Sequence, residues 1–296
     1  MNTHILLDIL SYPRFAGSAG EQHVLSEYFT PIEGSYYDQF GNWWYCTDLN
    51  STTLFTAHSD TVHKRGAVDK IPLSISSDNI ITVEGGGVLG ADCGTGMFII
   101  LEMIRANVPG TYVIYREEEI GGNGSSSSAY EEPHLYAKFN RAISFDRAGY
   151  TDVITAQAGG VCCSDDFAQA LADQLGMGFA PSPNGVFTDS ANLTDLVPEC
   201  TNLSVGYLNQ HSKFEMQDLG WLEKFIKAVK QVDWESLPVV RLVSNSDYLD
   251  YLGFEEPLQI RLLDIVERNP VAIAALLEEM GFDTFELEKA IDDLYR

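Results

Sequence analysis

Basic residues are scarce in this sequence of 296 residues. It contains 18 Lys and Arg against 43 Asp and Glu, which gives a formal net charge of −25 with histidine neutral. Proteins that bind DNA or RNA need clustered Lys and Arg to neutralise phosphates, so this composition argues against a nucleic-acid partner. A surface of this charge attracts cations instead, among them metal ions and the ammonium ends of peptides.

Long apolar runs are missing as well. No stretch of the sequence approaches the roughly 20 consecutive apolar residues of a membrane-spanning helix. Residues 1–17, MNTHILLDILSYPRFAG, lack the basic start, the apolar centre and the cleavage site of a secretory signal peptide. We therefore expect a cytoplasmic protein without a membrane partner. The hydrophobic fraction of 45% is that of a packed protein and argues against disorder.

Cysteine pairs of the Cys-x-x-Cys type are also absent. The five cysteines are an odd number in a long chain, which argues against a disulfide framework and against a thiolate zinc site. We expect most of them to be buried thiols. They are Cys46, Cys93, Cys162, Cys163 and Cys200.

Strand-like and helix-like patterns alternate over most of the chain. The alternation predicts an α/β fold, a three-layer α/β/α sandwich with a central mixed β-sheet. In such sheets, chemistry collects in the loops at the carboxyl ends of the strands. Strand patterns cover residues 51–57, 71–77, 79–84, 111–116, 141–146, 152–158 and 201–207, and helical patterns cover 4–10, 22–29, 95–107, 164–175, 189–196 and 218–231. The segment YYDQFGNWWYC predicts a hairpin that turns at Gly41 and Asn42.

The pattern changes after Pro238. Residues 246–296 contain no convincing strand and resemble three short helices, so we predict one domain over residues 1–240 and a helical C-terminal extension over 241–296. Its segment IAALLEEMGFD weakly resembles ubiquitin-associated helical modules. An amphipathic bundle that packs on its own domain, on a second subunit or on a partner is the plainer interpretation.

Five of the predicted strand ends are followed by residue types that bind metals. Because strand ends lie at one edge of a sheet, the five positions can converge on one point. Taken singly each is weak evidence, since an aspartate after a strand is often a helix cap. Three consecutive glutamates are harder to dismiss, because they repel one another and need solvent or cations for compensation. The positions are His58 with Asp60, Asp92, Glu117 to Glu119, Asp146 and His211.

A donor set of two histidines and several carboxylates, without thiolate, suits zinc, cobalt or manganese rather than a structural zinc site. The motifs themselves resemble the five ligand motifs of the co-catalytic zinc exopeptidase superfamily, which includes zinc aminopeptidases, aminoacylases and zinc carboxypeptidases. They are, in order, FTAHSDTVH, GVLGADCGTG, YREEEIGGNGS, ISFDRAG and GYLNQHSKFE. The resemblance covers residues 1–232 and implies a catalytic domain that hydrolyses a peptide or a small amide with two divalent ions, Zn²⁺ first and Co²⁺ or Mn²⁺ as alternatives.

The resemblance also assigns ligands. It implies that Asp92 bridges both metals, that His58 and Asp146 complete one site, and that Glu119 and His211 complete the other.

Two further roles follow from the same resemblance. Asp60 accepts a hydrogen bond from the imidazole of His58 and fixes its tautomer. Glu118 is the general base. The choice between Glu118 and Glu119 rests on aligning the family's Glu-Glu-Ile/Val-Gly, and a slip of one residue exchanges their roles. Cys93 stands where the family often has a second acidic residue, which leaves the role of that position open.

The intervals between the ligands are too short for an additional lid domain, and the absence of a lid favours an aminopeptidase among the superfamily's activities. A carboxylate then holds the substrate ammonium, with Glu118, Asp146 or Asp189 as candidates. Tyr207 is a candidate donor to the developing oxyanion, although packing is the plainer interpretation.

Three alternatives stay open. One is a carboxypeptidase or N-acyl amino acid deacylase, in which Arg147 or Arg116 holds a carboxylate. Another is a single-metal, cyclase-like relative. The third is a catalytically idle binding homologue whose helical tail docks a partner.

Overall fold

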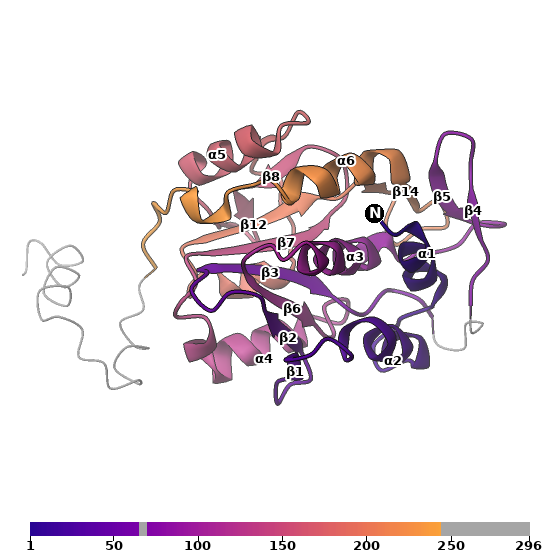
Figure 1. Cartoon of the computed structure of the whole chain (residues 1–296), viewed down its shortest axis with the longest axis horizontal. Coiled ribbons are helices and arrows are strands. Elements are labelled where there is room, and N and C mark those ends of the chain that lie inside the picture. Colours follow the sequence, from indigo (N-terminus) through magenta and orange to yellow (C-terminus); the bar gives the residue numbers. More distant parts are fainter. Residues whose placement is uncertain (65–69, 244–296) are drawn as a thin grey trace, which may run out of the picture. The chain divides into compact units, whose positions relative to one another are not determined.

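A computed structural model describes residues 1–64 and 70–243 of the chain (Figure 1). Their central feature is an eight-stranded sheet in the order β1-β2-β6-β3-β7-β12-β8-β11. The four middle strands run parallel, whereas β2 is antiparallel to β6 and β8 is antiparallel to β12. The strands are β1 (Tyr36–Tyr37), β2 (Trp43–Cys46), β3 (Thr53–His58), β6 (Thr111–Tyr115), β7 (Arg141–Arg147), β8 (Asp152–Ile154), β11 (Ala180–Ser182) and β12 (Glu199–Ser204).

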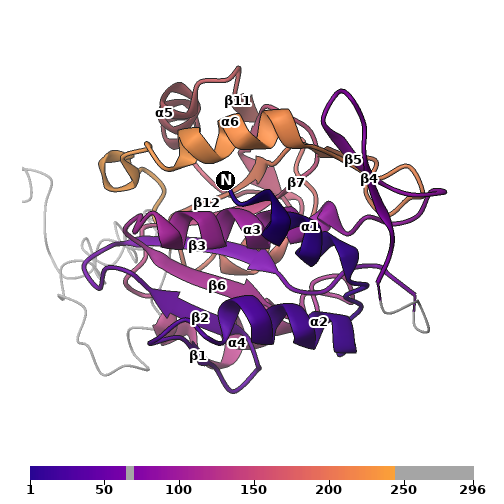
Figure 2. The ribbon, with the colours of Figure 1, turned by 45° about the vertical axis from the view of Figure 1, so that its right-hand side comes forward.

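Apolar side chains cover both faces of this sheet. Phe55 and Tyr112 point into one core cluster with helices α1 (Thr3–Ser11), α3 (Ala91–Arg105), α5 (Asp165–Leu175) and α6 (Leu219–Val229). Their strand neighbours Leu54 and Val113 point into a second cluster, on the face where α4 (Asn123–Glu131) packs. Successive side chains of a strand alternate between faces, so doubly buried strands are nearly continuous apolar runs. The predicted three-layer α/β fold with a mixed sheet is confirmed (Figures 1 and 2).

Two smaller sheets lie beside the central one. The larger is antiparallel, in the order β13-β14-β5-β4, and joins segments far apart in the chain. Figure 2 shows β4 and β5 at the right, beyond the end of α1. The strands are β4 (Leu73–Ile75), β5 (Ile80–Val83), β13 (Tyr207–Leu208) and β14 (Met216–Asp218), and the two-stranded sheet pairs β9 (Ala156–Gln157) with β10 (Gly160–Val161).

Helix starts follow the expected capping chemistry. The side chains of Ser164 and Asp218 accept hydrogen bonds from backbone N–H groups in the first turns of α5 and α6. Ser18 caps α2 (Ala19–Val24) in the same way, and α2 continues into the π-helical turn η1 (Leu25–Phe29). The α-helix expected at 189–196 is instead the short 3-10 helix η3 (Asp189–Leu193), and η2 (Pro133–Leu135) and η4 (Trp234–Ser236) are further 3-10 turns.

The predicted hairpin is confirmed, with Tyr37 paired to Trp43 across β1 and β2. Its turn is held by the carboxylate of Asp38, which accepts hydrogen bonds from the backbone N–H groups of Phe40 and Asn42. Gly41 takes the left-handed conformation that this turn requires, with φ of 81°.

The predicted helical extension over 241–296 lies almost wholly outside the described residues, so the boundary near 240 stays a prediction. Within residues 1–64 and 70–243, no helix combines the length and the apolar character needed to cross a bilayer.

Candidate metal centre

Three of the five predicted ligands lie at the carboxyl ends of parallel strands, as expected. His58 is the last residue of β3, Asp146 lies next to the end of β7, and Glu119 follows β6. The carboxyl ends of these neighbouring strands lie at one edge of the sheet, which brings the three side chains together.

The other two ligands come from elsewhere, and the expectation of a strand end is wrong for Asp92. It lies in the first turn of α3, which follows Gly90 in the left-handed region with φ of 71°. The segment before α3, residues 84–90, follows β5 of the four-stranded sheet and no strand of the central sheet. His211 lies in the turn between β13 and β14 of the four-stranded sheet.

Asp92 lies between the two histidines. Its Oδ1 is 3.1 Å from Nε2 of His58, and its Oδ2 is 3.1 Å from Nε2 of His211. The same nitrogen of His58 is 3.2 Å from Oδ1 of Asp146, and that of His211 is 3.1 Å from Oε1 of Glu119. The five side chains therefore form two groups that share Asp92.

The donors of this cluster suit divalent cations. Ligand atoms of His58, Asp92 and Glu119 all lie within 4.8 Å of one another. Imidazole nitrogens and carboxylate oxygens are the ligands of zinc and its neighbours in catalytic sites. The carboxylates of Asp92, Glu118, Glu119 and Asp146 gather here with at most 12% of any side chain exposed. Like charges so close together repel unless positive charge compensates them.

Protons supply part of this compensation. Burial lowers the pKa of His58, but the charges and hydrogen bonds of its neighbours, Asp146 foremost, outweigh burial and raise it well above its usual value. Hydrogen bonds to Asp92 and Glu119 raise the pKa of His211 to about 10. Because imidazole binds metal in its neutral form, uptake of divalent cations here has to release protons.

Asp60 holds the loop that carries the two glutamates. Its Oδ1 accepts a hydrogen bond from the backbone N–H of Glu118 (3.0 Å), and its Oδ2 accepts one from Glu119 (3.1 Å). Nδ1 of His58 is 3.0 Å from the backbone carbonyl of Asp60 and 3.4 Å from its carboxylate. The contact with His58 is therefore closer at the carbonyl oxygen than at the carboxylate. A bond from Nδ1–H to this carbonyl leaves Nε2 as the ligand nitrogen.

Glu118 and Glu119 occupy different positions at the cluster. Glu119 lies against His211, whereas Oε2 of Glu118 is 3.9 Å from Nε2 of His58. Adjacent residues of an extended strand point to opposite faces, but here Glu117 has φ of 62° and the backbone turns. Burial raises the pKa of Glu118 to about 9.

Asp146 is held from three sides. Its Oδ2 accepts a hydrogen bond from the hydroxyl of Thr188 (2.7 Å), and its backbone N–H donates to Oδ1 of Asn202 (3.0 Å). Its backbone carbonyl accepts a hydrogen bond from the hydroxyl of Tyr207 (2.9 Å). Tyr207 is 1% exposed, and this bond engages its hydroxyl proton. The catalytic role that the sequence suggested for Tyr207 stays a prediction.

Glu215 is a residue of the site that the sequence reasoning missed. Its side chain is buried, and its two oxygens accept four backbone N–H groups at 2.8–3.2 Å. These belong to residues 89–92, the segment that ends on Asp92. The signal was present in the motif GYLNQHSKFE, in which Glu215 is the one acidic residue.

Two other candidates of the sequence are buried. The thiol of Cys93 is fully buried and donates to the carbonyl oxygen of Phe145 (3.2 Å), and burial keeps its pKa well above its ordinary value. Its sulfur lies within 4.8 Å of ligand atoms of His58 and Asp146, but a protonated thiol is a poor ligand. Asp189 is 1% exposed, and its role as the partner of a substrate ammonium stays a prediction beside those of Glu118 and Asp146.

The two arginines considered for a substrate carboxylate have other surroundings. Nε and Nη2 of Arg147 are both 3.1 Å from Oδ2 of Asp152, so this guanidinium is already paired. Arg116 lines a separate pocket, none of whose lining residues is one of the five predicted ligands.

No protein-family model matches the sequence, and no curated protein matches it either. Solved structures do match its fold. The aminopeptidase PepT of Bacillus cereus has a TM-score of 0.65 at 15% identity, covering 77% of this chain and 96% of PepT. A tripeptidase of Staphylococcus aureus has a TM-score of 0.65 at 14% identity, with coverage of 77% and 96%.

The TET1 peptidase of Pyrococcus horikoshii has a TM-score of 0.62 at 15% identity, covering 77% of this chain and 98% of the other. At these identities the similarity establishes the fold. The resemblance inferred from the five motifs is thus confirmed at the level of the fold, and the chain shares the architecture of these peptidase structures.

Proposed function

We propose that this chain is a metal-dependent exopeptidase that holds two divalent ions between His58, Asp92, Glu119, Asp146 and His211. The observation that carries the proposal is the position of Asp92, whose two oxygens each lie 3.1 Å from a different histidine. A shared carboxylate of this kind is what a pair of ions needs. The nitrogen and oxygen donors favour Zn²⁺, with Co²⁺ or Mn²⁺ as alternatives.

When bound, the two ions would supply the positive charge that acidifies a water molecule and polarises the scissile carbonyl group. Glu118 is the proposed general base. It belongs to neither group of ligands, lies beside them, and its backbone is fixed by Asp60. Glu118 takes the proton of the attacking water and passes it to the leaving amine, the double role of a general base and acid.

Cleavage at the free N-terminus of a peptide or small amide is the proposed activity. The similar structures include an aminopeptidase and a tripeptidase, which supports an exopeptidase. An aminopeptidase is favoured over a carboxypeptidase or deacylase because Arg147 is paired with Asp152 and Arg116 lines a different pocket. A substrate carboxylate thus lacks the two partners that the sequence offered for it.

The test is a comparison of Leu-Gly-Gly with its N-acetylated and C-amidated forms, each with added zinc, cobalt or manganese and with a chelator as control. An aminopeptidase cleaves the free and the C-amidated peptides and leaves the N-acetylated peptide intact. Cleavage that requires a free C-terminus would identify a carboxypeptidase, and release of acetate a deacylase. Absence of any cleavage by protein that binds two ions would identify an idle homologue and refute the proposal.

The oligomeric state of this chain is a separate question from its activity. The Pyrococcus horikoshii TET1 peptidase assembles into a tetrahedron or a large octahedral shell. A homo-oligomer of this chain stays a prediction, which light scattering on the full chain measures. The C-terminal helices in which the sequence suggested an interface lie outside the described residues.

A further inference from the structure

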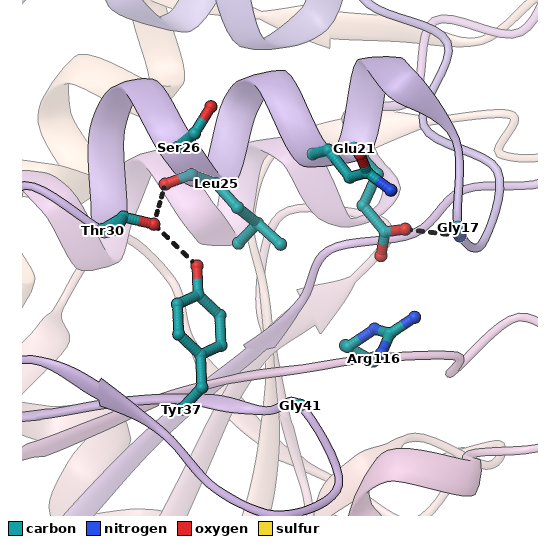
Figure 3. Close-up of a pocket in the computed structure, with 9 residues that line it drawn as sticks. Gly17, Glu21, Leu25, Ser26, Thr30, Tyr37, Gly41 and Arg116 are labelled. Carbon is teal, nitrogen blue, oxygen red and sulfur yellow. Dashed lines mark hydrogen bonds between the residues drawn. The ribbon is translucent and has the colours of Figure 1, made fainter.

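A second pocket lies between α2, its continuation η1 and the β1–β2 hairpin (Figure 3). Its cavity volume is about 310 Å³, at the lower end of the range of small-molecule sites. Leu25 forms its apolar wall, while the hydroxyl of Tyr37 lies at one end beside Thr30. The pocket is therefore large enough for a molecule with a few carbon atoms and polar ends.

Two opposite charges line this pocket without pairing. Figure 3 shows that the side chain of Glu21 extends from α2 toward the guanidinium of Arg116, with open space between the two groups. Within the described part of the chain, no ion pair joins the two groups. The only ion pair of Arg116 there is a long one, 3.7 Å to Glu117, and its guanidinium donates no hydrogen bond to a described residue. Its donors are thus available to a ligand.

Glu21 has hydrogen bonds but no cation within ion-pair distance among the described residues. The residue is 2% exposed, and its oxygens accept from the backbone N–H of Gly17 (2.6 Å) and from the hydroxyl of Ser59. The buried guanidinium of Arg14 donates its hydrogen bonds to the carbonyl oxygens of Ile9, Tyr12, Ser59 and Gly90. A carboxylate oxygen accepts up to two hydrogen bonds, so both oxygens keep capacity. A buried carboxylate without a close cation is costly, and a ligand ammonium would relieve that cost.

The path of Arg116 depends on a glycine of the hairpin. A Cβ atom at Gly41 would lie 2.8 Å from Nη1 and 3.1 Å from Cδ of Arg116. Glycine at this turn lets the arginine side chain lie across the hairpin and reach the pocket. A larger residue would displace it.

We propose that this pocket binds a free α-amino acid as its zwitterion, with the carboxylate on Arg116, the ammonium on Glu21 and the side chain against Leu25. A free amino acid carries an ammonium and a carboxylate group close together. These two charges complement the carboxylate of Glu21 and the guanidinium of Arg116, which face each other in this pocket. The assignment of this ligand class rests on the pocket alone and does not depend on the proposed peptidase activity.

The pocket also touches the elements that hold the metal centre. Glu21 bonds Ser59, which lies between His58 and Asp60 in the chain, and Arg116 precedes the glutamate loop. If the proposed function holds, the ligand is of the same class as the product, and its binding would act on turnover from outside the substrate site. Inhibition by a free amino acid should then have a noncompetitive component.

Calorimetric titration of the zinc-loaded full chain with L-leucine tests the binding directly. We expect L-leucine to bind, and L-leucine amide and N-acetyl-L-leucine to bind at least tenfold more weakly, because each lacks one charge. Arg116→Gln should weaken L-leucine at least tenfold, and Arg116→Lys should restore part of the loss. The matched control is Arg105→Gln. The guanidinium of Arg105 is also partly exposed, and it pairs with Glu102 on a different surface.

A second variant distinguishes L-leucine binding in this pocket from L-leucine binding at the metal centre. If L-leucine binding is lost in Asp92→Asn but kept in Arg116→Gln, the ligand occupies the metal centre and the inference is wrong. Equal binding of all three leucine compounds, or no binding at all, also overturns it. A peptidase assay that fails while L-leucine still binds through Arg116 would refute the proposed function and leave this inference standing.

Discussion

At the scale of single residues, Glu118 and Glu119 have different proposed roles, the first as the general base and the second as a metal ligand. Glu118→Gln should leave folding and metal content nearly unchanged and reduce turnover by about 10²–10⁴-fold, because only the proton transfer is lost. Glu119→Gln should instead lower metal content, since Glu119 is 3.1 Å from His211. Turnover and bound metal are measured on both variants. The opposite pattern would show that the two roles are exchanged.

Glu215 gives a second prediction at this scale. A glutamine there retains one carbonyl oxygen and turns its NH₂ group toward two of the four backbone N–H donors. We expect Glu215→Gln to lower the free energy of unfolding by roughly 2–5 kcal/mol and to weaken metal binding through Asp92. Chemical denaturation and metal titration measure the two effects. The control is Glu223→Gln on the exposed face of α6, where we expect no change in either. Unaltered metal affinity in Glu215→Gln would refute its positioning role.

At the scale of secondary-structure elements, the metal centre depends on how closely α3 packs on the sheet. A Cβ atom at Gly96 would overlap the carbonyl oxygen of Phe145 on β7 and the sulfur of Cys93. Gly96→Ala should therefore push α3 away from β7, at a cost of about 1–3 kcal/mol in the free energy of unfolding. Because Asp92 lies on α3 and Asp146 on β7, metal affinity should fall as well.

The matched control for this substitution is Gly160→Ala. No atom lies within 4 Å of the Cβ position at Gly160, and its φ is outside the left-handed region. Thermal unfolding and metal titration compare the two variants. Equal stability of Gly96→Ala and Gly160→Ala would mean that the close approach of α3 is not needed.

The elements differ in how far the sequence predicts them. The central strands are apolar runs buried on both faces, so β3, β6 and β7 could be predicted together with the ligands at their ends. Helix α4 could not, because its serines have low helix propensity in isolation. In the fold, Ser128 accepts a hydrogen bond from Tyr136 and Ser125 accepts one from Asn192, and these tertiary contacts stabilise the helix.

The candidate site, too, can be predicted from the sequence only in part. The motifs predict which side chains meet, and the structure brings all five together. The supporting contacts are not visible in the chain order, since Glu215 reaches back over more than a hundred residues to the segment before Asp92. Nor does the sequence distinguish the backbone carbonyl of Asp60 from its carboxylate as the partner of His58.

At the scale of the whole molecule, a charged cluster ties the end of the described chain to the sheet. Glu235 accepts hydrogen bonds from Ser51, Thr52 and Thr53 and pairs with Arg141 at 3.1 Å. Partial burial raises the pKa of Glu235, but these bonds and the Arg141 charge outweigh burial and lower it to about 2. Since the folded pKa lies below the unfolded value near 4.5, the stabilisation is full above that value and is lost as pH falls toward 2.

Glu235→Gln should therefore destabilise the protein at pH 7 and make a smaller difference at pH 3. Denaturant titrations of both proteins at the two pH values measure this, and their difference removes the contribution of the other carboxylates. An equal difference at both pH values would contradict the assignment.

The number of ions that each chain binds decides whether this molecule is a two-metal protein. We expect elemental analysis of zinc-loaded protein to give two ions per chain, and the Asp92→Asn variant to lose both together, because Asp92 is shared. One ion per chain, or an Asp92→Asn variant that keeps a full complement, would contradict the two-metal account.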